Sequence, residues 1–169
     1  RINPIIYEEV VNAIRIELPE SVEWTEVPVV HKLMRIVAMA SGRAFVGPEL
    51  CRNKDYVNIS VSYTVDLMMA IQAVSSIQPH MRPFLAAGRP EVKRVQQRVA
   101  EADMFLRQIV EARREAAKTP NYQKPDDMLQ WMIESQKKFG QKEDRELARC
   151  QLAIIVAAIH TTTVTITNA

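Results

Sequence analysis

The residues best suited to chemistry lie near the C-terminal end, where residues 157–163 read AAIHTTT. An unperturbed imidazole has a pKa of about 6.5, so His160 can exchange protons near neutral pH. Threonine hydroxyls within a helix bond to carbonyls one turn back, which often bends the helix and can open a local groove. Ala157 and Ala158 have small side chains and leave room for a ligand against the backbone. The segment is therefore a candidate for a site that binds a ligand and handles protons.

A purely structural interpretation of the same residues is also open. His160 can hydrogen-bond a neighbouring backbone group, and the threonines at 161–163 can fill a tight helix contact. The run Leu152–Ile159 contains no polar residue, and a helix that is apolar on all sides lies inside a protein. From the residues alone, this structural interpretation is the favoured one.

The helix that carries these residues is one of roughly six that apolar residues at helical spacing predict, with little strand. The fold class is therefore mainly α. The first helix is expected to pack through an apolar face of Ile6, Val10, Ala13 and Ile14, and Gly42 is expected to end the second helix. The predicted helices cover residues 4–18, 30–42, the segment from 90 to at least 109, 126–138 and the terminal apolar segment.

One segment, residues 55–74, is ambiguous. Val57, Ile59 and Val61 alternate with polar residues like a strand, while apolar residues from Tyr56 to Val74 also fit one face of a helix. Local propensity at the start of the segment favours a strand.

The composition is that of an ordinary globular chain, with 169 residues, 47% of them hydrophobic and 25% charged. A formal net charge of +2 gives no basic excess that would indicate a nucleic-acid partner. No uninterrupted apolar run approaches the roughly 18–20 residues needed to cross a bilayer. His31 and His80 have no metal-spaced partners, so no metal site is predicted.

Residues 152–168 resemble the oxygen-side helix of cytochrome P450 monooxygenases. That helix carries Ala or Gly, then Gly, any residue, an acid, Thr, and a second Thr or Ser, and residues 157–162 match in their small residues and threonines. Two further stretches, SGRAFVGPELCRN at 41–53 and KPDDMLQW at 124–131, resemble segments of fungal P450s of the ent-kaurene oxidase and indole-diterpene oxidase types. The three stretches occur in the family's order, so the resemblance extends from its D helix to its I helix. It also implies that residues 55–74 form a helix.

The resemblance implies a role for each matching residue. The family activates oxygen on a thiolate-bound haem, and Thr161 would take the place of its oxygen-side threonine. His160 stands where the family has an acid, and we expect it to substitute as a proton carrier. Ala157 and Ala158 would border the haem. The residues expected to line the substrate are Ile71, Val74, Ala158 and Thr162. Met68 and Met69, in the same segment as Ile71 and Val74, are further candidates.

Other parts of the family's machinery are not recognised in these residues. The pattern Glu-x-x-Arg occurs at 49–52, 91–94, 111–114 and 146–149, but all of these lie before residues 157–162, whereas the family's K-helix motif follows its oxygen-side helix. No Phe-x-x-Gly cysteine loop is present, and neither Cys51 nor Cys150 fits the haem-ligand loop. Since the chain opens on Arg1 and closes on Ala169 without a stop signal, we expect residues 1–169 to be a single partial P450 domain, truncated at both ends and inactive by itself.

Membership of the family implies further partners. These are haem with its iron ligand outside this chain, electrons from NADPH through a cytochrome P450 reductase, and a large apolar substrate of the terpenoid class. It also implies the cytosolic face of the endoplasmic reticulum membrane, reached through an N-terminal anchor missing from these residues.

Two alternatives remain at this point. A helical interaction module without catalysis agrees with the regular apolar stripe from Val92 to Ile109. An all-helical terpene cyclase would need acidic metal ligands, but the run DDMLQ at 126–130 lacks the further acid of that motif, and aspartates suit a helix N-terminus.

Overall fold

A computed structural model describes residues 2–18, 20–138 and 144–169. Within these ranges the chain is helical and contains no strand, as the mainly α prediction requires. Six long helices are joined by loops and by a short helical stretch, α4 (Arg82–Leu85), between two 3-10 turns. The long helices are α1 (Ile2–Glu17), α2 (Val29–Phe45), α3 (Lys54–Ser75), α5 (Pro90–Ala116), α6 (Met128–Lys138) and α7 (Asp144–Thr167).

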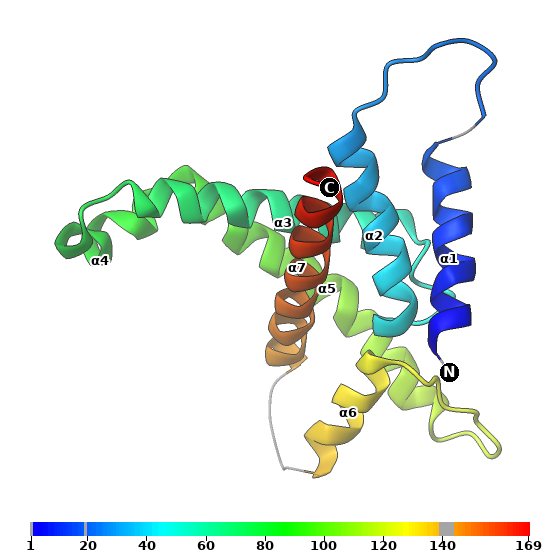
Figure 1. Ribbon diagram of the computed structural model, residues 1–169. Helices are drawn as coiled ribbons and strands as arrows, with labels where there is room; N and C mark the ends of the chain where they lie inside the picture. Colours follow the sequence, from blue (N-terminus) through cyan, green and yellow to red (C-terminus); the bar gives the residue numbers. More distant parts are fainter. Residues whose placement is uncertain (1, 19, 139–143) are drawn as a thin grey trace.

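Helix α7 lies at the centre of this arrangement and packs against α2, α3 and α5 (Figure 1). Helix α1 packs on the side of α2 that faces away from α7. Helices α3 and α5 lie side by side and extend away from the centre as an arm, with α4 at its tip (Figure 1). Helix α7 is therefore the element that the rest of the described chain holds in place.

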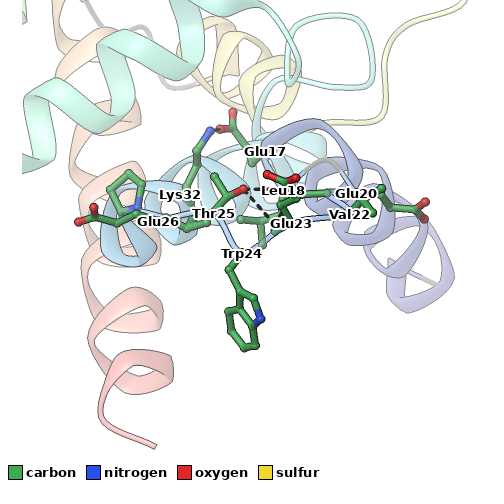
Figure 2. Close-up of a pocket in the computed structure, with 12 residues that line it drawn as sticks. Glu17, Leu18, Glu20, Val22, Glu23, Trp24, Thr25, Glu26 and Lys32 are labelled. Atoms are coloured by element: carbon green, nitrogen blue, oxygen red, sulfur yellow. Dashed lines mark hydrogen bonds and ion pairs between the residues drawn. The ribbon is translucent and has the colours of Figure 1, made fainter.

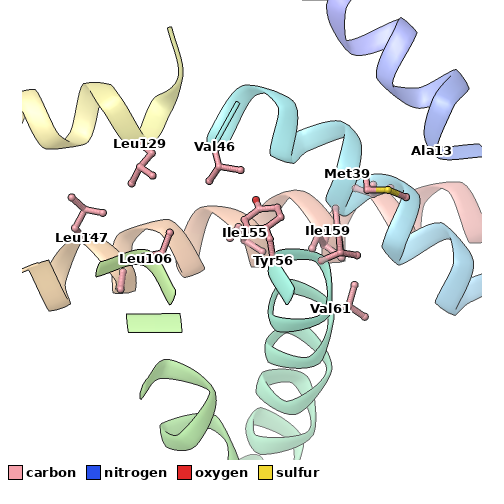
Figure 3. Close-up of a cluster of buried hydrophobic side chains, with 14 of the residues drawn as sticks. Ala13, Met39, Val46, Tyr56, Val61, Leu106, Leu129, Leu147, Ile155 and Ile159 are labelled. Carbon is pink, nitrogen blue, oxygen red and sulfur yellow. The ribbon is translucent and has the colours of Figure 1, made fainter. Parts of the chain in front are cut away.

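The hydrophobic core gathers around one side of α7. Ile155 and Ile159 of α7 pack among side chains of α2, α3 and α5, including Met39, Tyr56 and Leu106 (Figure 3). Burying a side chain of this size stabilises a fold by about 1.5–3 kcal/mol. This cluster fixes the rotation of α7 about its own axis.

Helix α1 docks through ion pairs and through part of the predicted apolar face, in which Ala13 is buried and Ile6 and Val10 are half-buried. Glu9 and Glu17 are buried, while Ile14 is exposed. Glu9 accepts two hydrogen bonds from Arg52, and Glu17 accepts one from Lys32 and one from Arg35. The expectation that Ile14 packs inward is wrong, because the buried carboxylates need charged partners and turn the helix toward them.

The ambiguous segment is helix α3 along its whole length. The side chain of Asn53 caps it by accepting hydrogen bonds from the backbone N–H groups of Asp55 and Tyr56. Ser60 and Thr64 bury their hydroxyls by donating to carbonyls one turn back. Tertiary burial on one face thus overrides the local strand propensity.

Gly42 does not end α2, which continues to Phe45. A Cβ atom at Gly42 would lie 2.8 Å from a ring carbon of Tyr56 and 3.2 Å from the Cβ of Cys51. The glycine is therefore needed for the close approach of α3, and the predicted stop at this position is wrong.

Residues 41–53 and 124–131, the two other stretches of the P450 resemblance, lie close together in the fold. Asp127, just before α6, accepts two hydrogen bonds from Arg113 of α5, and Arg113 also donates to the carbonyl of Val46. Gly47 has φ +88°, and a Cβ there would lie 2.9 Å from the Asp127 carboxylate. Asp127 also accepts from the backbone N–H of Gln130, as expected for an aspartate at a helix start.

Two helices are long and apolar enough to cross a membrane by length and composition alone, although no uninterrupted apolar run was expected to reach that length. They are Lys54–Ser75 of α3 and Glu146–Thr167 of α7, with mean hydropathy of 1.3 and 1.5. Both contribute residues to the core described above, and core helices of globular proteins pass the same test.

Candidate functional site

The two sides of α7 differ in what covers them. Leu152, Ile155, Ile159 and Thr163 are buried, whereas Ala153 and Ala157 on the other side are exposed. The expectation that the apolar run is buried on all sides is wrong for the described chain. The physical reason is that its neighbours α2, α3 and α5 pack on one side only.

The exposed side forms a narrow strip of small and hydroxyl side chains. We call Ala153, Ala157, Thr161 and Thr165 the open strip; they follow one another every four residues along the helix and are all exposed. The Thr161 hydroxyl donates to the carbonyl of Ala157, and the Thr165 hydroxyl donates to the carbonyl of Thr161 at 2.8 Å. Such bonds one turn back are those expected of helical threonines.

His160 lies to one side of this strip. Successive helix residues are turned by about 100°, so the imidazole and the Thr161 hydroxyl leave the helix in different directions. His160 lines a cavity of about 390 Å³ between α2, α3 and α7, which we call the three-helix cavity. Thr163, Val164 and Thr167 of α7 line the same cavity, but Thr161 does not.

The predicted substrate-lining residues lie on two helices, α3 and α7. Ala158 is half-buried and Thr162 exposed on the flank of α7 away from His160, while Ile71 of α3 is 51% exposed and Val74 half-buried. Neither Ile71 nor Val74 lines the three-helix cavity.

The wall that α3 gives to the three-helix cavity is instead made by four neighbouring residues. These residues are Val65, Met68, Met69 and Gln72. Their separation by three or four positions places them on one face of the helix, which could be predicted from the sequence.

A cavity larger than the three-helix cavity lies elsewhere, under the loop between α1 and α2. It has a volume of about 680 Å³ and is lined by residues 17–18, 20–28 and Lys32. The indole of Trp24 points away from the loop into solvent (Figure 2). None of the predicted site residues lies there, and the cavity is bordered by an exposed acidic loop rather than by packed helices.

The two cysteines differ from the iron ligand of a haem thiolate. Burial, more than the nearby Glu9 carboxylate, raises the pKa of the Cys51 thiol to about 11, so it stays protonated near neutral pH. Cys150 is exposed on α7 itself and cannot lie across a macrocycle from Thr161 on the same helix. Among the described residues there is also no group of three side chains that could hold a metal ion.

Sequence comparison shows which known proteins this chain is similar to. The chain is 36% identical over 166 residues to cytochrome P450 monooxygenase ATR3 of Stachybotrys chlorohalonatus, an alignment that includes 98% of the chain and 35% of that protein. It is 39% identical to cytochrome P450 monooxygenase BOA4 of Botryotinia fuckeliana, over 90% of the chain and 31% of that protein. Over the region that it covers, the chain belongs to the fungal cytochrome P450 family. Penicillium shearii cytochrome P450 monooxygenase esdpI matches in the same way, at 34% identity over 93% of the chain.

The chain spans about a third of the length of these P450 relatives. No protein-family profile and no solved structure matches it. The helices of the described residues thus form a partial P450 fold, as predicted from the three sequence stretches.

Proposed function

We propose that the protein acts as a haem-thiolate monooxygenase and that this chain forms the distal side of its haem site. The observation that carries the proposal is the open strip of α7. It is the uncovered side of the central helix in the described chain, its side chains are small, and its hydroxyls follow the helix axis. Such a strip fits the flat face of a macrocycle, while the cysteine ligand would come from outside these residues.

Haem would supply the iron centre on which oxygen is bound and activated. The Thr161 hydroxyl has one proton and two lone pairs, and its proton already bonds the Ala157 carbonyl. Thr161 Oγ1 is therefore set to accept a hydrogen bond from a water or a protonated group on the open strip. Ala157 and Ala158 keep the backbone accessible beside it.

His160 would carry protons from the other flank. Its imidazole lines the three-helix cavity rather than the open strip, so it would hold a proton at a ring nitrogen there. Water would have to carry that proton around α7 to Thr161. This role replaces the acid that the family has at the same position.

The finer parts of the proposal concern substrate and surroundings. Ala158 and Thr162 share the flank of α7 next to the open strip and would contact the substrate, with Ile71 and Val74 supplied by α3. The substrate would be a large apolar molecule, of which a terpenoid is the class we propose. Electrons would come from NADPH through a cytochrome P450 reductase, on the cytosolic face of the endoplasmic reticulum.

The test uses the protein as its gene encodes it, with Thr161→Ala and the control Thr161→Ser, which keeps a hydroxyl. We expect the fraction of consumed NADPH recovered as oxidised terpenoid to fall by about tenfold or more in the alanine variant, since a positioned hydrogen-bonding group contributes at least that much to rate. The serine variant should retain most of the coupling.

Two results would count against the proposal at different levels. Unchanged coupling in Thr161→Ala removes Thr161 from the mechanism. A wild-type protein whose reduced, carbon monoxide-treated form lacks the absorption band of a thiolate-bound haem rejects the haem-thiolate assignment itself.

A further inference from the structure

The three-helix cavity has the size and lining of a small-molecule site. Its volume of about 390 Å³ falls within the range of roughly 300–1,000 Å³ typical of such sites. Helices α2, α3 and α7 each contribute to the wall. The apolar part of the lining consists of Val30, Met34, Val65, Met68, Met69 and Val164.

Methionines make up a large share of this wall. Three of the eight methionines in the chain, Met34, Met68 and Met69, line the cavity. Methionine is flexible and polarizable, so a wall of this kind adapts to ligands of different shape. Met34 and Met68 are half-buried and Met69 is exposed, which leaves their apolar surface available to a ligand.

A few polar groups lie among the apolar ones. Gln72 and His160 bring an amide and an imidazole to the cavity, and Asn168 keeps its side-chain oxygen while its Nδ2 donates to the carbonyl of Val164 at 2.8 Å. Thr163 buries a hydroxyl that has no partner, and of the described side chains with such a buried unpaired atom it alone lines this cavity. Neutral hydrogen-bonding groups of a ligand would thus find partners.

The lining also limits the charge of a ligand. No aspartate, glutamate, lysine or arginine contributes to it, and His160 is the one titratable side chain in the wall that the described residues form. A charged group would lose its hydration there without gaining an opposite charge, which is costly. The cavity therefore favours a neutral molecule.

We propose that the three-helix cavity binds a neutral, mainly apolar small molecule that carries one hydroxyl or carbonyl group. Its body contacts the methionines, and its polar group hydrogen-bonds among Gln72, His160 and Thr163. The site is separate from the open strip, since neither Ala157 nor Thr161 lines it. The proposal does not depend on haem and stands or falls independently of the monooxygenase assignment.

The probe is 1-decanol, with decanoate at pH 8 as a charged molecule of the same length. Binding is followed by NMR of the protein, as its gene encodes it, with ¹³C-labelled methionine methyl groups. We expect saturable shifts of the Met34, Met68 and Met69 signals with 1-decanol, and at least tenfold weaker binding of decanoate. The exposed Met81 and Met104 are internal controls that should not move.

Two variants locate the site. Met68→Trp fills the cavity and should weaken 1-decanol binding by tenfold or more, while Met104→Trp places the same side chain on the exposed face of α5 and should leave it unchanged. Circular dichroism shows whether each variant keeps its helices, and Met68→Phe replaces Met68→Trp if that variant does not. Absent shifts, equal shifts of Met81 and Met104, or decanoate binding as tight as 1-decanol binding would overturn the proposal.

Discussion

The two sides of α7 are made from one apolar run yet differ in the size of their residues. Large side chains, Leu152, Ile155 and Ile159, face the core, while Ala153 and Ala157 face outward. Polarity does not distinguish the sides over this stretch, because all of these residues are apolar. The comparison shows that volume decides which side packs, since a core filled to crystal-like density needs the branched residues.

The largest effect should come from removing volume on the packed side. Ile159 is fully buried, so Ile159→Ala should lower the free energy of unfolding by about 2–5 kcal/mol through lost burial and the cavity left behind. Ile166→Ala makes the same change on an exposed part of the same helix and should cost about 0.5 kcal/mol or less. Urea unfolding followed by circular dichroism measures both.

Equal losses in these two variants would contradict the division of α7 into a packed and an open side. A large loss for Ile166→Ala would mean that the end of α7 is covered in solution by something outside the described residues.

A smaller effect of opposite sign is expected at the boundary between the two sides. The Thr163 hydroxyl is buried without a partner, whereas Thr167 donates its hydroxyl to the Thr163 carbonyl at 2.7 Å. Because an unpaired buried polar group costs about 1–3 kcal/mol, Thr163→Val should raise the free energy of unfolding by an amount within that range. Thr167→Val, which removes a made hydrogen bond, should not raise it.

The measurement is thermal or urea unfolding of the two valine variants in the absence of any apolar additive. A loss of stability in Thr163→Val would show that its hydroxyl has a partner in solution, such as a bound water.

Much of the fold could be predicted from the sequence because helix formation leaves local signals. Prolines and three-four spacing placed the long helices other than α3, for which local signals were ambiguous and the P450 resemblance decided. The motif at 157–162 identified α7 as the helix of interest. The end of α2 could not be predicted, because the glycine at position 42 is required by its close contact with Tyr56 of another helix rather than by a helix end. Local patterns carry no information on such a contact.

The candidate site shows the same limit. Thr161 and Ala157 share a helix face by their spacing alone, so their proximity followed from the sequence. The three-helix cavity depends on how α2 and α3 cross α7, and Met34 and Gln72 lie far apart in sequence. Ile71 and Val74 lie on α3 but not on the face that lines this cavity, and their contact with substrate stays a prediction.

Helix α1 differs from α7 because ion pairs of buried glutamates add to its apolar packing. Burial alone would raise the pKa of Glu17, but hydrogen bonds from Arg35 and Lys32 and their charges outweigh burial and lower the pKa below its ordinary value. A group with a lowered pKa contributes stability that is present above its unfolded-state pKa and is lost as the pH falls through the folded-state pKa. The packed side of α7 has no such dependence.

The smallest predicted effect is therefore a pH-dependent one. The contribution of Glu17 should be complete at neutral pH and decline once the pH drops below the ordinary glutamate value of 4.5. Glu17→Gln should cost about 1 kcal/mol at pH 7, because the cationic partners Lys32 and Arg35 are partly exposed, and should make stability less dependent on pH below that value. Urea unfolding at a series of pH values measures both, with Glu8→Gln on the exposed side of α1 as the control. If wild type and Glu17→Gln lose stability in parallel as the pH falls, the Glu17 ion pairs do not hold α1. Its docking would then have to rest on the Glu9–Arg52 pair, on buried Ala13 and on the half-buried apolar residues beside it.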